Sequence, residues 1–561
     1  MRSLVASLVV TLLVACGSDP SDSPSNPLPS GTGASGSGGA GAAGGHGGAG
    51  ASGGASGGAS VGGASVGGGG SGVGASGGGG SGGGIDCGAL QPGAPAELVS
   101  EGQVGRILLR GTIITPTQVI DGEVLIEDQL ITCVAASCAG EPGAADASVV
   151  ETNGVILPGL IDAHNHVQYN VFDETDWAPM QTYSNHNQWT NEDRYGAMVD
   201  TKQYLGGDGS SPIDLSCELV KYGELKGLVA GTTSMLGAAA PANKVCYGSL
   251  VRTIDQSSND LPDDKVQVAT LFPNTAAADG VCANFADGDT DAWVAHVAEG
   301  VDATALDEFA DVGTVTTVDG CLYSPKTAII HGTALGDAEL TIMAANGMDL
   351  VWSPQSNVFL YGGGTDLSKT TNIPLALMKG INVAMGPDWS LGGSQNMLDE
   401  LRFANQVDNA EWGDILDAKA LVEMATVNGA QALGISQYVG TIEEGKRADI
   451  LVIGGNTAAP YDAVLAAHPL DVRLVLVDGV ALYGDPVLKP LAPAAPGCET
   501  VNVGADKFLC VAEAGGTADN KFGQTYADIS SELEQALVEY DALDLTEWNF
   551  APLTPLVRCD P

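Results

Sequence analysis

Two histidines stand two residues apart at the end of a short apolar run. The run GVILPGLIDAHNH places His164 and His166 directly after strand-forming residues. Because residues i and i+2 of a strand point to the same side, this segment can aim two imidazoles at one point. Neutral imidazole is the commonest side-chain ligand of divalent metal ions. The pair therefore predicts one half of a metal site.

Further polar residues end other apolar runs in the middle of the chain. His296 ends AWVAH, His331 ends TAIIH, and Asp388 follows VAMGP. A single histidine at a strand end is more often a hydrogen-bonded structural residue. Several on one rim, where the carboxyl ends of parallel strands meet, favour a metal site. Glu299 follows His296 by three residues, so it should lie just beyond the same strand.

The segments that must position these residues alternate between strand-like and helix-like patterns. Between 158 and 435, eight apolar runs alternate with helical patterns such as ATALDEFADV. This alternation predicts an α/β fold, a (β/α)₈ TIM-type barrel. The strand candidates are Val155–Ala163, Leu228–Met235, Ser249–Ile254, Val266–Phe272, Trp293–Val297, Thr327–His331, Leu350–Ser353 and Val383–Gly386.

Two β-rich segments flank the predicted barrel. Residues 99–157 and 436–486 are rich in β-branched residues bounded by Gly, Asp and Pro, and we expect them to form one composite β-sandwich domain. A Pro/Ala linker then leads to a Cys-containing C-terminal extension, 490–561. We expect that extension to be an appendage that packs on the barrel.

Several motifs, taken in order, resemble one enzyme superfamily. PGLIDAHNH, HVAE, IIHG, SPQSN, the segment ending at Asp388 and GTIEEGKRADILVI are similar to the amidohydrolase superfamily. The resemblance is strongest to its branch of deaminases, chlorohydrolases and imidazolonepropionase-like enzymes. It covers roughly 99–485 and implies a metal-bearing (β/α)₈ barrel with a composite β-sandwich. Those expectations agree with the pattern of strands and helices.

The resemblance implies roles for the matching residues. His331 would polarise the substrate and Glu299 would shuttle a proton. The run VQVATLF contains no Lys that could be carboxylated to bridge two metals, so a mononuclear site is expected. One divalent ion, Zn²⁺ with Fe²⁺ as the alternative, would be held by His164, His166, His296 and Asp388.

The expected reaction is hydrolysis of a non-peptide carbon–nitrogen bond in a small molecule. A bound divalent ion lowers the pKa of water toward ~7. Asp388 could accept the proton of that water, and Glu299 could donate a proton to the leaving nitrogen. Deamination and the opening of a cyclic amide or amidine both fit this chemistry. The alternatives are a binuclear amidase or dipeptidase-like hydrolase and an inactive surface lipoprotein that binds a ligand.

Two features bear on the substrate. Deaminases of this branch often carry His before the Pro of the seventh-strand motif, and here the run reads Val351-Trp352-Ser353-Pro354, which counts against nucleobase deamination. The loop after the first strand is long and aromatic, so it either covers the pocket as a lid or lies on the barrel's outer surface. Trp389 either lines the pocket or packs in the core. The loop residues in question are Trp177, Tyr183, His186 and Trp189.

The first residues predict export. Residues 1–16 resemble a lipoprotein signal peptide, with Arg2, an apolar run too short to span a bilayer and the ending Leu-Val-Ala-Cys16. A lipid on Cys16 would anchor the protein to the bacterial outer membrane or cell surface and be its sole membrane contact. Residues 17–84 are mostly Gly, Ser and Ala and predict a disordered tether.

Charge and cysteine content narrow the partners further. The 561 residues include 22 Lys+Arg and 68 Asp+Glu, a formal charge of −46, so nucleic acid is not an expected partner. Besides Cys16, ten of the 11 cysteines remain, an even number that predicts disulfides in an exported protein. Short spacings favour Cys133–Cys138 and Cys498–Cys510. Pairings of the other six, and the oligomeric state, stay open.

Overall fold

The structure is a computed structural model that describes residues 89–209, 211–237, 244–256, 261, 265–270, 272–494 and 497–558. The predicted signal peptide with Cys16 and the tether lie outside the described residues. Cys87 and Cys559 do as well. Among the described helices, none combines the length and the apolar character that a membrane crossing needs.

Short parallel strands carry the predicted site residues. One sheet has the order β13 (Val383–Met385), β12 (Asp349–Trp352), β11 (Thr327–His331), β10 (Ala292–Val297) and β9 (Val266–Ala269). A second has the order β6 (Leu160–Asp162), β7 (Thr232–Met235) and β8 (Arg252–Thr253). Each of the eight predicted strand runs overlaps one of these strands, so the predicted strands of the α/β fold are confirmed.

The two parallel sheets meet where the first and last predicted ligands lie. The backbone N–H of Ala163 donates to the Met385 oxygen at 3.0 Å, and the N–H of Asp388 donates to the His164 oxygen at 3.0 Å. The N–H of His166 donates to the Asp388 oxygen at 2.5 Å. These bonds place the end of β6 beside the end of β13, as the barrel order requires. The hydrogen-bonded strands otherwise form two sheets, so a closed barrel stays a prediction.

Helices follow most of the parallel strands. Several begin at a polar cap: the side chain of Asn274 accepts the N–H of Ala277, and that of Asp302 accepts the N–H of Ala305. Such caps satisfy N–H groups that the first helical turn leaves free. The helices of this part are α1 (His186–Trp189), α2 (Asp193–Leu205), α3 (Ser216–Leu228), α4 (Thr275–Asp287), α5 (Ala303–Val312), α6 (Asp337–Asn346), α7 (Pro354–Tyr361), α8 (Ile373–Met378), α9 (Met397–Val407), α10 (Ala418–Met424) and α11 (Val427–Ala432).

Alternation along the strands divides the core into two clusters. On β10, Ala292 and Val294 belong to the same buried cluster as Ile330 of β11. Trp293 packs instead in the larger cluster that contains the helices. Because strand side chains alternate with period two, His296 continues the face of Ala292 and Val294. The strand pattern therefore turns His296 toward the face shared by the parallel strands.

Both flanking segments contribute to one ten-stranded sheet with the order β17-β18-β16-β15-β14-β5-β2-β3-β4, with β1 paired to β5. Strand β14 runs antiparallel to β5, in a register that sets Ile450 opposite Pro158 and Ile453 opposite Val155. The predicted two-layered sandwich and the domain limits stay predictions. The strands are β1 (Glu97–Ser100), β2 (Arg106–Ile114), β3 (Val119–Glu127), β4 (Leu130–Ala135), β5 (Ser148–Pro158), β14 (Ile450–Ile453), β15 (Val472–Val477), β16 (Val480–Gly484), β17 (Gly497–Asn502) and β18 (Asp506–Ala512).

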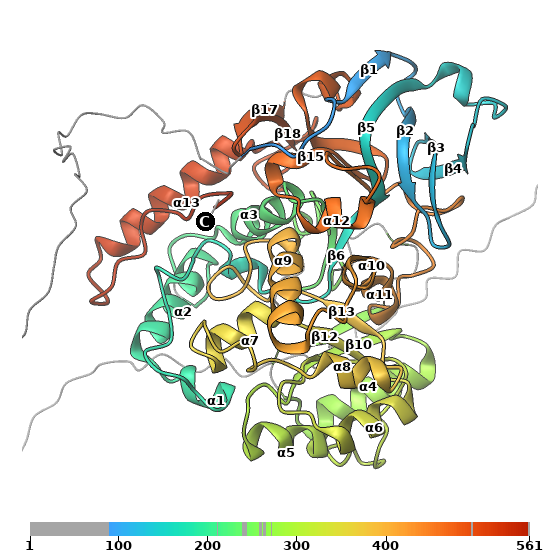
Figure 1. The fold of residues 1–561 in the computed structure, drawn as a ribbon. Helices are drawn as coiled ribbons and strands as arrows, with labels where there is room; N and C mark the ends of the chain where they lie inside the picture. Colours follow the sequence, from blue (N-terminus) through green and yellow to red (C-terminus); the bar gives the residue numbers. More distant parts are fainter. Residues whose placement is uncertain are drawn as a thin grey trace, which may run out of the picture. The chain divides into compact units, whose positions relative to one another are not determined.

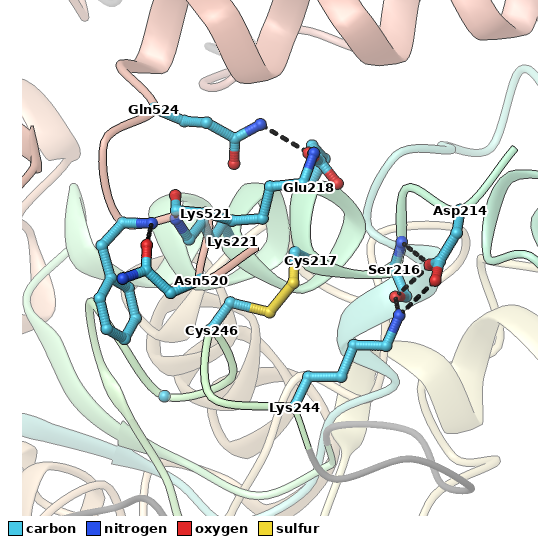
Figure 2. The surroundings of a disulfide bond; sticks show 12 residues. Asp214, Ser216, Cys217, Glu218, Lys221, Lys244, Cys246, Asn520, Lys521 and Gln524 are labelled. Carbon is cyan, nitrogen blue, oxygen red and sulfur yellow. Dashed lines mark hydrogen bonds and ion pairs between the residues drawn. A yellow bond between two sulfur atoms is a disulfide. The ribbon is translucent and has the colours of Figure 1, made fainter. Parts of the chain in front are cut away.

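The C-terminal segment packs on α3. Strands β17 and β18 extend the ten-stranded sheet, and α13 (Tyr526–Asp541) contacts both α2 and α3 (Figure 1). Lys521 Nζ and Gln524 Nε2 both donate to Glu218 Oε1, at 2.8 and 2.5 Å (Figure 2). All residues of α3 are buried as a result. The C-terminal extension thus covers one side of α3, and the charged residues of this helix are buried together with its apolar ones.

Four disulfides are present among the described residues. Two are the pairs that short spacing favours, Cys133–Cys138 and Cys498–Cys510, and both predictions are confirmed. The other two are Cys217–Cys246 and Cys282–Cys321, which join residues 29 and 39 positions apart. Figure 2 shows Cys217 of α3 bonded to Cys246, in the segment that leads to β8. Sequence spacing could not have selected these longer links.

Candidate metal centre

The predicted ligands come together at the ends of four parallel strands. The ring centroid of His164 lies 5.1 Å from that of His166, 4.6 Å from that of His296 and 5.2 Å from that of His331. Ligand atoms of His164, His166 and His296 all lie within 4.8 Å of one another, as do those of His164, His331 and Asp388. The side chains thus face one point, although they come from segments more than 200 residues apart.

Buried polar atoms in this cluster have no hydrogen-bond partner in the described part of the chain. They are His164 Nε2, His296 Nε2 and Asp388 Oδ1. Asp388 Oδ1 stands 3.0 Å from His164 Nε2 and 3.3 Å from His166 Nε2. Unpaired polar atoms cost free energy when buried. A cation shared between these atoms removes that cost, and imidazole with carboxylate is a donor set that suits Zn²⁺ and similar divalent ions. The residues present therefore fit a metal.

Neighbouring groups orient the ligands. His296 Nδ1 lies 3.1 Å from the Ala269 carbonyl oxygen of β9. A carbonyl only accepts, so this nitrogen carries the proton and Nε2 keeps its lone pair for a metal. The hydroxyl of Ser356 donates to Asp388 Oδ2 at 2.5 Å, which leaves Oδ1 facing the imidazoles. Such outer contacts fix the direction of each ligand.

The protonation states are those that ligands require. Burial lowers the pKa of His164 and of His166 to about 4, and that of His296 to about 3. Burial alone would raise the pKa of Asp388, but the imidazoles beside it, His164 foremost, hold that pKa below its ordinary value. At neutral pH the three imidazoles are therefore neutral and the carboxylate is ionised, as metal binding demands.

The backbone is constrained at this rim. His331 and Asp388 have φ angles of 64° and 72°, in the left-handed region that favours glycine. Residues held in such conformations gather at functional sites. A Cβ on Gly386 would stand 2.4 Å from the backbone nitrogen of His164, so glycine is needed where β13 passes β6. The close approach that brings Asp388 to the histidines depends on that glycine.

Glu299 lies beside the cluster, on the side of His331. Its Oε1 is 3.9 Å from His331 Nε2 and accepts a hydrogen bond from the Tyr361 hydroxyl at 2.8 Å. Its Oε2 is 3.1 Å from His186 Nδ1. Burial would raise the pKa of Glu299, but His331 and His186 lower it to about 2. Glu299 is thus an ionised carboxylate with one oxygen toward the centre and one toward the loop.

His331 is held by the seventh-strand motif. Its Nδ1 lies 3.0 Å from Asn357 Oδ1, and its Nε2 is 3.9 Å from Asp388 Oδ2. The ring therefore sits between Glu299 and Asp388, with Nε2 toward both carboxylates. The role that the family resemblance implies for His331, polarising the substrate, stays a prediction.

Aromatic residues of the loop after β6 pack against Trp389, whose ring lies beside His166. The Trp389 ring centroid is 5.5 Å from that of His166 and 5.7 Å from that of Trp189. Trp177, Trp189 and Trp389 are 0%, 6% and 3% exposed, so these indoles form a packed layer at the edge of the site. Tyr183 instead donates its hydroxyl to Glu192. The contacts support the lid rather than an outer-surface location, and its function as a lid stays a hypothesis.

Sequence reasoning missed three residues near Glu299 and Asp388. Tyr361 ends α7 and Glu308 lies within α5, and neither belongs to a motif or a strand end. Only the tertiary structure brings them to the site. Ser356 belongs to the SPQSN motif, which was recognised without a role for that hydroxyl. The motif was the one signal that could have identified it.

Comparisons with known proteins relate this chain to amidohydrolases. The profile of the amidohydrolase family matches residues 272–482. A 5-methylthioadenosine/S-adenosylhomocysteine deaminase from Desulforamulus reducens is 28% identical over 435 residues, which cover 69% of this chain and 96% of the relative. A 5'-deoxyadenosine deaminase from Methanothermobacter thermautotrophicus is 26% identical over 425 residues, which cover 68% and 94%.

Solved structures resemble this chain in fold. An adenosine deaminase from Xanthomonas campestris with bound zinc has a TM-score of 0.51 at 19% identity and covers 67% of this chain and 92% of its own. The atrazine chlorohydrolase TrzN from Arthrobacter aurescens, complexed with zinc, has a TM-score of 0.52 at 18% identity and covers 69% and 96%. Together with the family match, these neighbours imply a TIM-barrel α/β fold.

Proposed function

We propose a reaction for this chain from the premise that it is a hydrolase of the amidohydrolase family acting on carbon–nitrogen bonds. The reaction is hydrolysis of a non-peptide carbon–nitrogen bond in a small molecule, by deamination or by opening of a cyclic amide or amidine. One observation carries the proposal: the unpartnered atoms of His164, His296 and Asp388 converge beside the ionised Glu299. A surface lipoprotein that had lost its activity would not need to keep this set.

Four residues would hold one divalent ion: His164, His166, His296 and Asp388. Zinc is the proposed ion because the structural neighbours contain it, and Fe²⁺ is the alternative. When bound, the ion supplies Lewis acidity that lowers the pKa of water. Strand β9 and the residue after it read VQVAT, without a Lys that could bridge two ions, which supports a mononuclear centre.

Two carboxylates and one imidazole would handle substrate and protons. Neighbouring imidazoles lower the pKa values of Glu299 and Asp388, so both carboxylates are ionised at neutral pH and neither is already occupied by a proton when water attacks. Asp388 Oδ2 already accepts the Ser356 hydroxyl, whereas Glu299 Oε1 faces His331. Glu299 is therefore the group that carries the proton onward to the leaving nitrogen. His331 Nε2 would contact the polarised substrate atom between the two carboxylates.

Adenine nucleosides are the first substrates to test. Relatives of this chain are named as deaminases of 5-methylthioadenosine, S-adenosylhomocysteine and 5'-deoxyadenosine. The sequence argument against nucleobase deamination rested on the run Val351-Trp352-Ser353-Pro354, which contains no His. The Trp352 side chain packs in the larger cluster that contains the helices and donates its indole N–H to Thr370 Oγ1 at 2.8 Å. Trp352 lies on the face of β12 opposite to Val351, and Val351 belongs to the buried cluster of Val294 and Ile330. The identity of residue 352 therefore has little effect on the face of the sheet that carries His296.

A metal assay joined to a substrate screen tests the proposal. Purified protein should contain one tightly bound divalent ion per chain and release ammonia from an aminated heterocycle, or open a cyclic amide or amidine. Two tightly bound ions would favour the binuclear amidase, since His164, His331 and Asp388 form a second convergent group. A metal-loaded protein that hydrolyses no carbon–nitrogen bond in such a panel would overturn the proposal.

We also propose that the chain is exported and anchored at Cys16. The four disulfides support an oxidising environment. In bacterial cells the protein should separate with the membrane fraction, and Cys16→Ser should move it to the soluble fraction. Equal fractionation of both forms would contradict the anchor.

A further inference from the structure

A short segment of the loop is fixed to the chain that carries Glu299. The N–H of His186 donates to the Glu299 carbonyl at 3.2 Å, and the N–H of Val301 donates to the Ser184 carbonyl at 2.7 Å. A Cβ on Gly300 would lie 2.5 Å from the Ser184 oxygen, so the two backbones are in direct contact. The docked segment therefore delivers the His186 ring to a defined place beside Glu299.

The His186 ring bridges two carboxylates from different elements. Nδ1 lies 3.1 Å from Glu299 Oε2, after β10, and Nε2 lies 2.7 Å from Glu308 Oε1, on α5. The second oxygen of Glu308 accepts the N–H of Ala298 at 3.0 Å, which fixes that carboxylate in turn. Both ring nitrogens face acceptors, so both must carry protons. The ring is an imidazolium with an acceptor at each end.

The charge on this ring follows from those neighbours. Burial alone would lower the pKa of His186, but its hydrogen bonds to Glu299 and Glu308 raise that pKa to about 10. The charged groups that face the ring are these two carboxylates. Exposure of the side chains is 22% for His186 and 5% for Glu299, so the cation is held at the outer edge of the buried centre. The mechanism proposed above makes no use of it.

Glu299 has a different neighbour on each oxygen. Oε2 is directed to His186, and Oε1 accepts the Tyr361 hydroxyl at 2.8 Å and lies toward His331. Rotation of the carboxylate would break the contact to His186. An oxygen that must take a proton and give it to a leaving nitrogen needs a fixed direction. The His186 contact supplies that direction from outside the site.

We propose that His186 is a positioning residue, held between Glu299 and Glu308, that aims Glu299 Oε1 into the site when the loop segment 184–189 is docked. The inference rests on the proposed function, in which Glu299 carries the proton. The loop whose tryptophans pack against Trp389 beside His166 thus also positions the proton-carrying group.

His186→Gln tests the role through kcat and its pH dependence. The variant should keep its metal and a KM within about threefold, while kcat falls about 10- to 100-fold, as is usual for outer-shell partners. Removing the cation should also raise the pKa of Glu299, so the acid limb of the kcat profile should move toward neutral pH. Asn187→Ala is the matched control, since Asn187 is exposed on the same short helix. A kcat and profile equal to those of Asn187→Ala would overturn the proposal.

Glu308→Gln provides a second variant that leaves the ring in place. The loss of one acceptor should lower the pKa of His186, so the alkaline limb of kcat should move to lower pH while the acid limb changes less. An unchanged alkaline limb would contradict the clamp. This test remains available if His186→Gln does not fold.

A readout without turnover separates this inference from the proposed reaction. In ¹⁵N-histidine NMR of the full chain, one imidazole should remain doubly protonated at pH 7 and titrate near pH 10, and its signal should vanish in His186→Gln. A neutral His186 at pH 7 would overturn the inference even in an active enzyme. Conversely, an inactive metal-loaded protein that shows the imidazolium would sink the proposed reaction and not the clamp.

Discussion

The histidines of the metal centre form one group and His186 alone forms a second, and the two groups differ in the number of carboxylates beside each imidazole. In the metal centre, three imidazoles surround the single carboxylate of Asp388, and burial holds their pKa values at about 3 to 4. At the loop, one imidazole lies between two carboxylates, and the pKa of His186 rises to about 10. The same side chain is therefore neutral in one group and a cation in the other. Burial keeps the first group neutral, whereas hydrogen bonds to two carboxylates outweigh burial at His186.

The difference in charge suits the two groups to different functions. Neutral imidazoles with free lone pairs can bind a metal, whereas an imidazolium can only donate. The cation therefore cannot compete for the ion, although its ring belongs to the same residue type. It acts instead on Glu299, which lies between the two groups. Removing a carboxylate from either group should therefore change metal binding or proton transfer in a predictable direction.

The largest effect is expected from removing the carboxylate of the metal centre. Asp388→Asn should lose most of the bound metal and lower kcat by about a thousandfold or more, because the proposed reaction depends on the Lewis acidity that Asp388 would help to hold in place. Metal analysis of the purified variant and ammonia release measure the two losses. A variant that keeps both its ion and full turnover would remove Asp388 from the centre.

The next effect is expected at the carboxylate shared by the two groups. Glu299→Gln should keep its metal and lose about 10²- to 10⁴-fold in kcat, the range for a proton-transfer group. Glu423→Gln is the control, because Glu423 pairs with Lys419 at the surface, where an ion pair contributes little. Unchanged turnover in Glu299→Gln would assign proton transfer to another group.

The pH dependence of stability should show both groups at once. The metal-centre imidazoles have folded pKa values below the ordinary 6.5, so the unfolded chain binds more protons between pH 6.5 and about 4, and metal-free protein should lose stability as pH falls through that window. His186 has a raised pKa, so its contribution is complete below pH 6.5 and is lost as pH rises to about 10.

Thermal unfolding of the metal-free protein across that range measures both slopes. His186→Gln should flatten the alkaline slope and leave the acid slope in place. If the substitution changed the acid slope alone, the assignment of the two protonation states would be reversed. Added zinc should raise the melting temperature most above pH 6.5, where the ligands are neutral in both states.

The smallest effect is expected outside both groups, where the C-terminal extension contacts α3. Lys226 Nζ donates hydrogen bonds to Thr554 Oγ1 and to Gln395 Oε1, each at 3.1 Å. The first bond is buried and the second is partly buried. Thr554→Val should cost about 1 kcal/mol in the free energy of unfolding, the net value of one hydrogen bond. Denaturant unfolding measures it. A drop in kcat beyond about threefold would show that the extension acts on the centre itself.

The sequence was informative where chemistry and local pattern coincide. Strand ends marked by His164, His296, His331 and Asp388 were visible because short, continuous apolar runs lead into a polar residue. The pair Cys133–Cys138 was visible because five residues of chain leave few other partners. These features need no knowledge of distant contacts.

Features that depend on distant contacts could not be predicted. Glu308 lies on a helix of ordinary amphipathic pattern, and its meeting with His186 requires the loop to be docked. Tyr361 ends a helix far along the chain, and nothing near it marks a hydroxyl aimed at Glu299. The pair Cys217–Cys246 likewise depends on how α3 packs. The protonation states depend on these tertiary contacts, so the different charges of the two groups could not be predicted from the sequence either.

Metal content measured together with chelation is the most direct test of the central account. Full-length protein should contain one divalent ion per chain, lose its carbon–nitrogen hydrolysis when a strong chelator removes that ion, and regain it with Zn²⁺ or Fe²⁺. The same protein carrying His164→Ala should neither hold the ion nor recover. Activity that survives complete removal of metal, or in His164→Ala, would contradict the account.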